Sequence, residues 1–152
     1  MILRRYKGGT YKGSLMANKR IAIIGAGPAG LMAAEVLSQY HYDIEIYEQK
    51  PSAARKFLMA GKTGLNISHA EPVEMFIQRY DHAAWLGPWI EQCDAAWIQN
   101  WMQGLGIESY IGSSGRVFPV EMKAAPLLRA WLKRLIANGV KFHYRHRCVA
   151  LS

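Results

Sequence analysis

The chain has 152 residues and a formal net charge of +8 at pH 7; 51% of its residues are hydrophobic and 20% are charged. This composition excludes a disordered or fibrous chain and fits one globular domain. No apolar run approaches the roughly 20 residues that span a bilayer, and the first residues lack the apolar stretch of a secretory signal. The two cysteines, Cys93 and Cys148, are isolated and show no metal-ligand spacing. We therefore expect a cytoplasmic protein with reduced thiols, no metal and no membrane span.

Positive charge collects near the two ends of the chain. Residues 1–15 and residues 133–147 are basic and contain no acid, whereas the middle is nearly balanced. Such clusters can bind nucleic acid, but a solvated tail and a solvated strand face explain them more simply, so we expect no nucleic-acid partner. The basic side chains in the two clusters are Arg4, Arg5, Lys7, Lys12, Lys133, Arg134, Lys141, Arg145 and Arg147.

The first residues differ in character from the rest. Residues 1–16 are Gly-rich and basic, show no apolar periodicity, and end at a second methionine, Met16. We predict that residues 1–16 form a disordered extension and that the folded part covers residues 17–152.

The next three segments predict one βαβ unit. Residues 20–24 form a short apolar run that stops at a glycine, as a buried parallel strand does. Residues 28–40 carry apolar side chains at helical spacing, and residues 43–48 alternate as a second strand. This stretch has the size of a βαβ unit, whose crossover is almost always right-handed.

The chain then becomes largely helical. The pattern predicts helices at residues 72–80, 85–92, 95–103 and 125–138, a hairpin of 107–111 with 116–120, and a last strand at 140–145.

Punctuating residues support these boundaries. Pro88 suits the start of its helix, Asp94 can cap the next one, and Gly139 suits a left-handed stop. Four tryptophans recur at four-residue steps within their helices; this spacing could be a ligand platform, but we expect it to be ordinary core. They are Trp85, Trp89, Trp97 and Trp101.

The motif that carries chemistry is the G-x-G-x-x-G run at residues 25–30, GAGPAG. It follows an apolar strand, opens a helix, and has an acid, Glu48, at the end of the next strand, which is the context of a dinucleotide-binding fingerprint. Gly25 permits the tight turn, Gly27 lets the backbone approach a pyrophosphate, and Gly30 allows close packing of helix on strand.

The groups around this motif suggest how a dinucleotide would be held. The N–H groups at the helix start, including those of Ala29 and Gly30, would face the phosphates, with the helix dipole behind them. Glu48 can accept hydrogen bonds from ribose hydroxyls, and its charge disfavours a 2′-phosphate, hence NADP. Because NAD and FAD share the ADP half, this motif does not choose between them.

A second glycine run imitates a phosphate-binding P-loop. Gly61-Lys62-Thr63 resembles the end of such a loop, but the glycine required five residues before the Gly-Lys pair is replaced by Lys56. We therefore place the phosphate cradle at residues 25–30 instead.

Two longer segments carry a more specific signal: RKFLMAGKTGLNIS at 55–68 and GRVFPVEMKA at 115–124. With the glycine motif, they resemble the BaiN-like bacterial FAD-dependent oxidoreductases, which are two-dinucleotide-type flavoproteins, from about residue 19 to the chain end. The resemblance implies FAD as cofactor, NAD(P)H as a candidate electron donor, and a small-molecule substrate that the sequence does not identify. The fold it implies is α/β: a Rossmann-like FAD-binding βαβ core with a largely helical insertion and a β-hairpin.

The resemblance also implies site residues. It places Arg55 and Lys56 near the adenosine ribose and pyrophosphate, where cations offset the diphosphate charge; ordinary surface charge is the alternative. It brings the segment from Gly61 to Asn66 close to the inner part of the cofactor. Most members carry further glycines and an Arg-Cys pair where this chain has residues 62–65, KTGL. With the fingerprint, the expected cofactor-binding residues are Gly25, Ala26, Gly27, Ala29, Gly30, Glu48, Arg55, Lys56, Gly61, Asn66 and Cys148.

In this set Cys148 acts through its backbone. By the resemblance, it aligns with a residue near the end of the strand after the second crossover, whose N–H and C=O hydrogen-bond adenine; a buried, inert cysteine is the alternative. Members of the family run to about twice this length, so we expect residues 17–152 to be the N-terminal part of the FAD-binding domain, without the substrate domain and the C-terminal segment that closes over FAD. The catalytic residues stay unassigned, and the chain alone should bind FAD weakly or not at all and lack turnover.

Two other functions remain open from the residues alone. An NAD-binding Rossmann dehydrogenase fits the glycine fingerprint but not the two longer segments. A non-catalytic nucleotide- or RNA-binding module would use the two basic ends.

Overall fold

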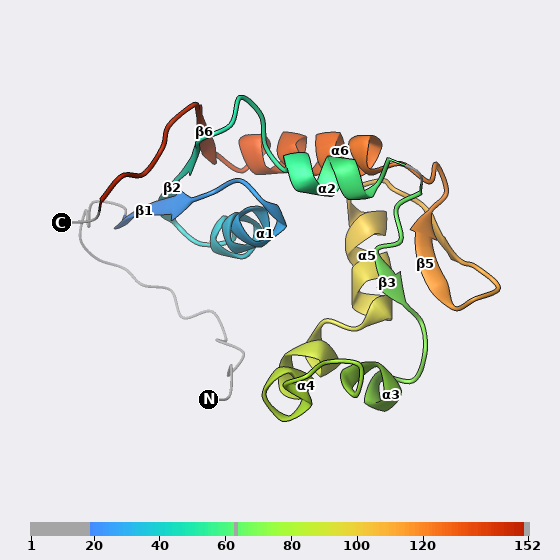
Figure 1. Cartoon of the computed structure of the whole chain (residues 1–152). Helices are drawn as coiled ribbons and strands as arrows, with labels where there is room; N and C mark the ends of the chain where they lie inside the picture. Colours follow the sequence, from blue (N-terminus) through green and yellow to red (C-terminus); the bar gives the residue numbers. More distant parts are fainter. Residues whose placement is uncertain (1–18, 63, 151–152) are drawn as a thin grey trace.

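The computed structural model describes residues 19–62 and 64–150 (Figure 1). The extension predicted for residues 1–16 lies outside this range.

The chain begins with the predicted βαβ unit. Strand β1 (Lys19–Ile24), helix α1 (Pro28–Leu37) and strand β2 (Tyr42–Glu48) follow one another, and the two strands pair in parallel with Ile21 opposite Ile44. Strand β6 (Lys141–Tyr144) pairs in parallel with the other edge of β2, giving the strand order β1-β2-β6. The α/β class and the Rossmann-like parallel sheet are therefore confirmed.

Helix α6 (Ala124–Ala137) lies beside α1 and completes the core of this part. Leu31, Ile46 and Leu135 are fully buried in one apolar cluster drawn from α1, β2 and α6. The indole N–H of Trp131 donates to the Glu35 carboxylate at 3.0 Å, so the one polar atom of a buried ring is satisfied across the two helices.

The segment between β2 and α6 forms the insertion. It contains α2 (Arg55–Ala60), β3 (Ser68–His69), α3 (Val73–Ile77), α4 (Ala83–Gln92), α5 (Ala95–Gly104), β4 (Ser109–Ile111) and β5 (Arg116–Pro119). Its strands make an antiparallel sheet in the order β3-β5-β4. Figure 1 shows α3 and α4 below the rest of the molecule, joined to it through α5. The predicted helical insertion and the hairpin are present.

A second apolar cluster joins the insertion to the Rossmann part. Met102 of α5, Val117 of β5 and Leu127 of α6 are fully buried in it. Trp101 packs against both clusters and meets Trp131 edge-on, with ring centroids 4.8 Å apart. The prediction that the tryptophans are core is correct for Trp101.

The same prediction is wrong for Trp85 and Trp89, which are 70% and 53% exposed. The reason is that α4 turns another face toward its neighbour: Gly87 lies against Ile77 of α3, which leaves the tryptophan face open.

Several boundaries also differ from the predicted ones. Helix α4 starts at Ala83 because the His82 carbonyl accepts hydrogen bonds from the N–H groups of Trp85 and Leu86, so Pro88 lies inside the helix rather than at its start. Helix α1 stops at Leu37, where Ser38 caps it and turns its hydroxyl to the Glu35 carbonyl.

Strand β1 is parallel as predicted but not buried. It is an edge strand of the described sheet, and Ile24 is 54% exposed. Among the described residues, no helix combines the length and the apolar character needed to cross a membrane.

Candidate functional site

The glycine loop between β1 and α1 has the geometry that its sequence requires. Gly25 has a φ of +101°, in the region that favours glycine. A Cβ on Gly30 would lie 2.0 Å from the Gly25 carbonyl oxygen, so only glycine lets the helix pack so closely on the loop. A Cβ on Gly27 would meet nothing within 4 Å, so this residue faces open space where a ligand can approach the backbone.

Helix α1 presents free donors to that space. It begins at Pro28, which has no N–H, and no described residue accepts a hydrogen bond from the N–H of Ala29 or Gly30. These donors and the positive end of the helix dipole favour an anion at this point.

Glu48 is held over the loop by two backbone donors. One carboxylate oxygen accepts from the N–H of Ala26 at 2.9 Å, and the other accepts from the N–H of Lys50 at 2.8 Å. Each oxygen keeps a lone pair for a further donor. Ala26 is fully buried and its N–H is used here, so within the predicted set it acts by orienting Glu48.

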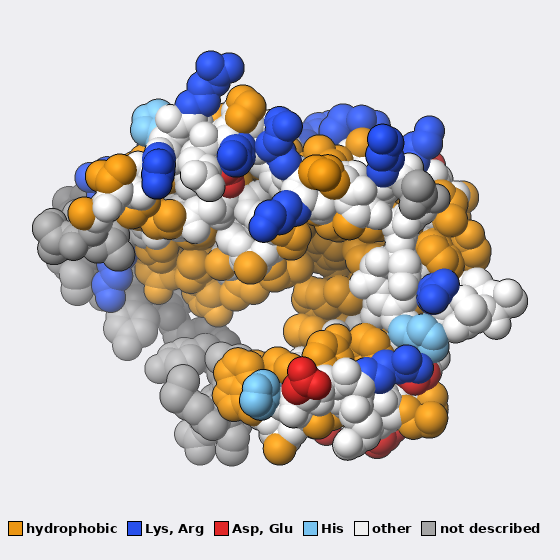
Figure 2. Space-filling model, viewed as in Figure 1, with side chains coloured by type: hydrophobic (Ala, Val, Ile, Leu, Met, Phe, Trp, Pro, Cys, Tyr) orange, Lys and Arg blue, Asp and Glu red, His pale blue; other side chains and the backbone are white. Residues whose placement is uncertain are grey.

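A pocket of about 360 Å³ brings four of the predicted residues together: Gly27, Glu48, Arg55 and Lys56 all line it. Helix α2 supplies the two cations. It is placed by Ala54, which takes a left-handed φ of 50° and donates its N–H to the Ala26 carbonyl at 2.8 Å. Both cations are exposed, and Figure 2 shows Lys and Arg side chains gathered over this upper face of the molecule.

A second pocket, of about 280 Å³, lies at the carboxyl ends of the parallel strands. Gly25, Glu48, His146 and Cys148 are among the residues that line it. Cys148 is exposed, which rules out the alternative of a buried cysteine. Sequence reasoning missed His146, because its distance from β2 gives no local signal that the chain folds back there.

Gly61 and Asn66 do not line either of these pockets. A Cβ on Gly61 would lie 2.4 Å from the Cβ of Ala124, so this glycine allows α2 to pack on the start of α6. Asn66 is exposed, in the loop before β3. The structure therefore gives Gly61 a packing role, and neither residue lines the pockets that gather six other predicted residues: Gly25, Gly27, Glu48, Arg55, Lys56 and Cys148.

A polar network covers the side of the sheet next to the second pocket. The Tyr47 hydroxyl donates to the Glu45 carboxylate at 2.6 Å, and the His143 ring contacts the same oxygen at 3.0 Å. The hydrogen bond from Tyr47, together with His143 and Arg20, lowers the pKa of Glu45 below its ordinary value. The same bond raises the pKa of Tyr47. The network therefore fixes the orientation of the Tyr47 ring.

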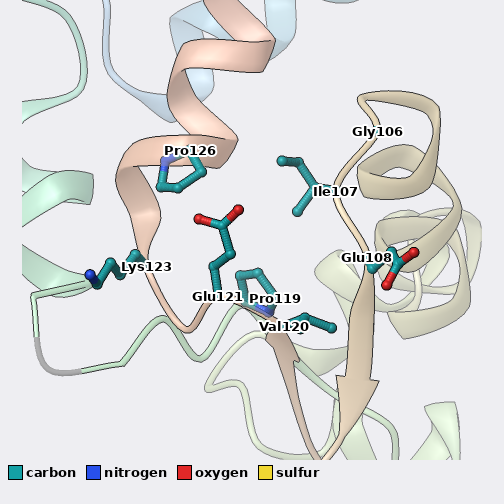
Figure 3. A pocket seen from close by; sticks show the side chains of 8 residues that line it. All are labelled: Gly106, Ile107, Glu108, Pro119, Val120, Glu121, Lys123 and Pro126. Carbon is teal, nitrogen blue, oxygen red and sulfur yellow. The ribbon is translucent and has the colours of Figure 1, made fainter.

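Another pocket lies in the insertion, far along the chain from the glycine loop. It has about 210 Å³ and is lined by residues of the hairpin and the start of α6. Figure 3 shows Glu121 between Ile107 and Pro126, whereas Glu108 and Lys123 point away to opposite sides. The polar groups of a ligand site converge on one point. Those of this pocket do not, so we assign it no ligand.

Several known proteins resemble all or part of this chain. The likeness to THI4 of Thermovibrio ammonificans has a TM-score of 0.51 at 16% identity and covers 84% of this chain and 38% of that one, which shows the fold alone. L-amino acid deaminase from Proteus vulgaris gives a TM-score of 0.40 at 15% identity, over 91% of this chain and 42% of that one. The NAD-dependent dihydropyrimidine dehydrogenase subunit PreT of Salmonella typhimurium is 56% identical over 32 residues.

These relatives are longer than the region they share with this chain. The PreT match spans 21% of this chain and 8% of the relative. The model of the HI0933-like protein Rossmann domain, in contrast, matches residues 19–152. The chain thus belongs to the HI0933-like Rossmann-domain family of flavoproteins.

Proposed function

We propose that this chain is the FAD-binding portion of a flavin-dependent oxidoreductase and that it binds the ADP half of FAD. One observation carries the proposal: Glu48 lines both the pocket beside the glycine loop and the pocket at the strand ends. In ADP, the ribose likewise lies between the diphosphate and the adenine. The diphosphate then belongs at Gly27 and the start of α1, the ribose at Glu48, and the adenine beside Cys148.

The charges of the site agree with this orientation. The free N–H groups of α1 and the cations Arg55 and Lys56 lie on the diphosphate side of Glu48. Glu48 accepts from ribose hydroxyls and repels a 2′-phosphate, so we expect FAD or NAD rather than NADP to suit this pocket.

The motif at 55–68 supports a closer assignment to the BaiN-like branch of the family. When bound, the flavin would supply hydride transfer, whereas the residues described here bind and orient its ADP half. NAD(P)H is the proposed electron donor and a small molecule the proposed substrate, in a cytoplasmic protein without a nucleic-acid partner.

An NAD-binding dehydrogenase is the second candidate, because the fingerprint serves both cofactors and the matched PreT protein is named as NAD-dependent. A longer version of the protein separates the two. If it is purified with visible flavin absorbance and releases FAD on denaturation, the flavoprotein assignment holds. A colourless protein that binds NAD but not FAD would favour the dehydrogenase.

The binding site itself is tested with ADP, 2′-phospho-ADP and Glu48→Gln in equilibrium dialysis. The wild-type chain should bind ADP about tenfold more tightly than 2′-phospho-ADP, because the Glu48 carboxylate repels the 2′-phosphate in a partly solvated site. Glu48→Gln keeps the size of the side chain and removes its charge, so the preference should shrink toward equality. A chain that binds neither ligand, or a variant with an unchanged preference, would contradict the proposed site.

A further inference from the structure

The chain after β6 makes an unusual turn. Arg145 has a φ of 61°, a left-handed conformation that a non-glycine residue rarely adopts. Its N–H donates to the Lys50 carbonyl at 3.2 Å, and the next N–H, that of His146, donates to the Glu48 carbonyl at 2.9 Å. The strained turn therefore fastens the chain across the end of β2, beside the carboxylate assigned to the ribose. Strain of this kind persists where surrounding contacts enforce it, often at binding sites.

The turn also fixes the imidazole of His146. The ring Nδ1 lies 2.8 Å from the Tyr144 carbonyl oxygen. A carbonyl only accepts, so Nδ1 carries the hydrogen, and in the neutral ring Nε2 is an acceptor. No described residue makes a hydrogen bond to Nε2. His146 thus offers one free acceptor at a pocket wall.

Two neighbouring rings hold that imidazole in place. His146 meets Tyr47 and His143 edge-on, at centroid distances of 6.1 and 5.7 Å. Tyr47 and His143 stack on each other at 4.6 Å, and both bind Glu45. A base entering the pocket would therefore meet an ordered aromatic wall rather than a freely rotating side chain.

We propose that His146 selects adenine through its 6-amino group, with Nε2 as the acceptor; this rests on the proposed function, which places the base in this pocket. Adenine carries an N6 donor, whereas a 6-oxo purine carries an acceptor at the same position. Two acceptors cannot pair, so a 6-oxo base would lose this hydrogen bond. The site should therefore favour the base that carries a donor at this position.

The test compares ADP with inosine diphosphate, in which an oxygen replaces the 6-amino group and N1 carries a hydrogen. NMR titration of the full chain should give about a tenfold preference for ADP in the wild type. His146→Phe keeps an aromatic ring and removes this acceptor, so the preference should become clearly smaller. His146→Gln can return an oxygen acceptor and should restore part of it. Amide spectra of both variants outside residues 141–150 serve as the control for folding.

The possible results distinguish a failure of the His146 assignment from a failure of the proposed function. If the wild type binds both nucleotides equally, or if His146→Phe keeps the full preference for ADP, the role of His146 is overturned and the proposed function stands. If the wild type binds neither nucleotide, the proposed function fails and this assignment fails with it.

Discussion

The Rossmann part, which comprises β1, α1, β2, β6 and α6, and the α3–α4 lobe (residues 73–92) are built in different ways. In the Rossmann part, Leu31, Ile46 and Leu135 are fully buried and come from three separate elements. In the lobe, the buried residues are Ile77 and Gly87, while Trp85 and Trp89 lie largely in solvent. The first region is held by contacts between distant segments, whereas the second is held mainly by the packing of two neighbouring helices.

Charge separates the two regions as well. The lobe contains three acids and one base, Arg79, although the chain as a whole has a net charge of +8. The basic side chains gather instead over the α2 and α6 side, next to the proposed diphosphate site (Figure 2). We therefore expect substitutions to act strongly on both stability and nucleotide binding in the Rossmann part, and weakly on either in the lobe.

The largest expected effect compares one glycine from each region. Gly30→Ala forces a Cβ to 2.0 Å from the Gly25 carbonyl oxygen, so it should cost at least about 3 kcal/mol of unfolding free energy. Gly87→Ala puts its Cβ 3.4 Å from an Ile77 methyl group, an ordinary contact in a helix interior, and should change stability by less than about 1 kcal/mol. Denaturant unfolding measures both free energies. Equal losses would contradict the expected difference between the Rossmann part and the lobe.

The next effect compares a buried apolar residue with an exposed aromatic one. Leu135→Ala empties a fully buried position between α1, α6 and the sheet and should cost about 3 kcal/mol. Trp89→Ala removes a larger side chain, but one that is 53% exposed, and should cost less than about 1 kcal/mol. A loss at Trp89 as large as that at Leu135 would show that the lobe is packed more tightly than its exposure indicates.

A smaller effect concerns the joint between the regions. The Asp94 carboxylate accepts from the Trp97 N–H at 2.8 Å and caps α5, which carries the lobe. Asp94→Ala should cost about 1 kcal/mol, and Asp94→Asn, which retains a capping oxygen, should cost only a few tenths. Thermal unfolding of the two variants measures the difference. Identical melting curves for the two variants would show that the Asp94 cap does not contribute to stability.

The smallest effect depends on pH. The Tyr47 hydrogen bond lowers the pKa of Glu45 in the folded chain, so the folded state binds its proton less readily than the unfolded state. The resulting stabilisation is present above the ordinary value of 4.5 and is lost as the pH falls through the lowered folded value. Glu45→Gln should therefore lower the melting temperature slightly at pH 7, and the difference should vanish in strong acid.

The lobe supplies a matched control for this prediction. Glu74 is exposed and makes no salt bridge with any described residue; its charge meets only the dipole of the short helix α3, in whose first turn it lies. Glu74→Gln should therefore change the melting temperature at pH 7 less than Glu45→Gln does. A loss for Glu45→Gln that persists unchanged in strong acid would show that its effect does not come from the charged carboxylate.

Local chemistry made part of the fold predictable. The glycine loop needs residues that tolerate a positive φ and a close approach, and Gly25 and Gly30 meet both needs. Asp94 caps α5, and Gly139 ends α6 with a φ of +86°, as predicted. In each of these cases, the deciding interaction lies within a few residues along the chain.

Other features depend on contacts that no short window of sequence contains. Helix α2 has only six residues and follows a left-handed Ala54 that is fixed by the distant Ala26 carbonyl. Strand β3 has two residues and exists because Ser68 pairs with Val117 of β5. The exposure of Trp89 likewise depends on which face of α4 meets α3. These features were missed because the partners are chosen by the tertiary fold.

The central claim is that the glycine loop and the two pockets joined by Glu48 hold the ADP half of a flavin cofactor. Titration of the isotope-labelled chain with ADP, followed by ¹⁵N–¹H NMR, tests it most directly. We predict saturable shifts of the Ala29, Gly30, Glu48 and Cys148 amides, with the signals of α3 and α4 unmoved. Shifts confined to residues 73–104, or no shift in residues 25–30 at millimolar ADP, would contradict the claim.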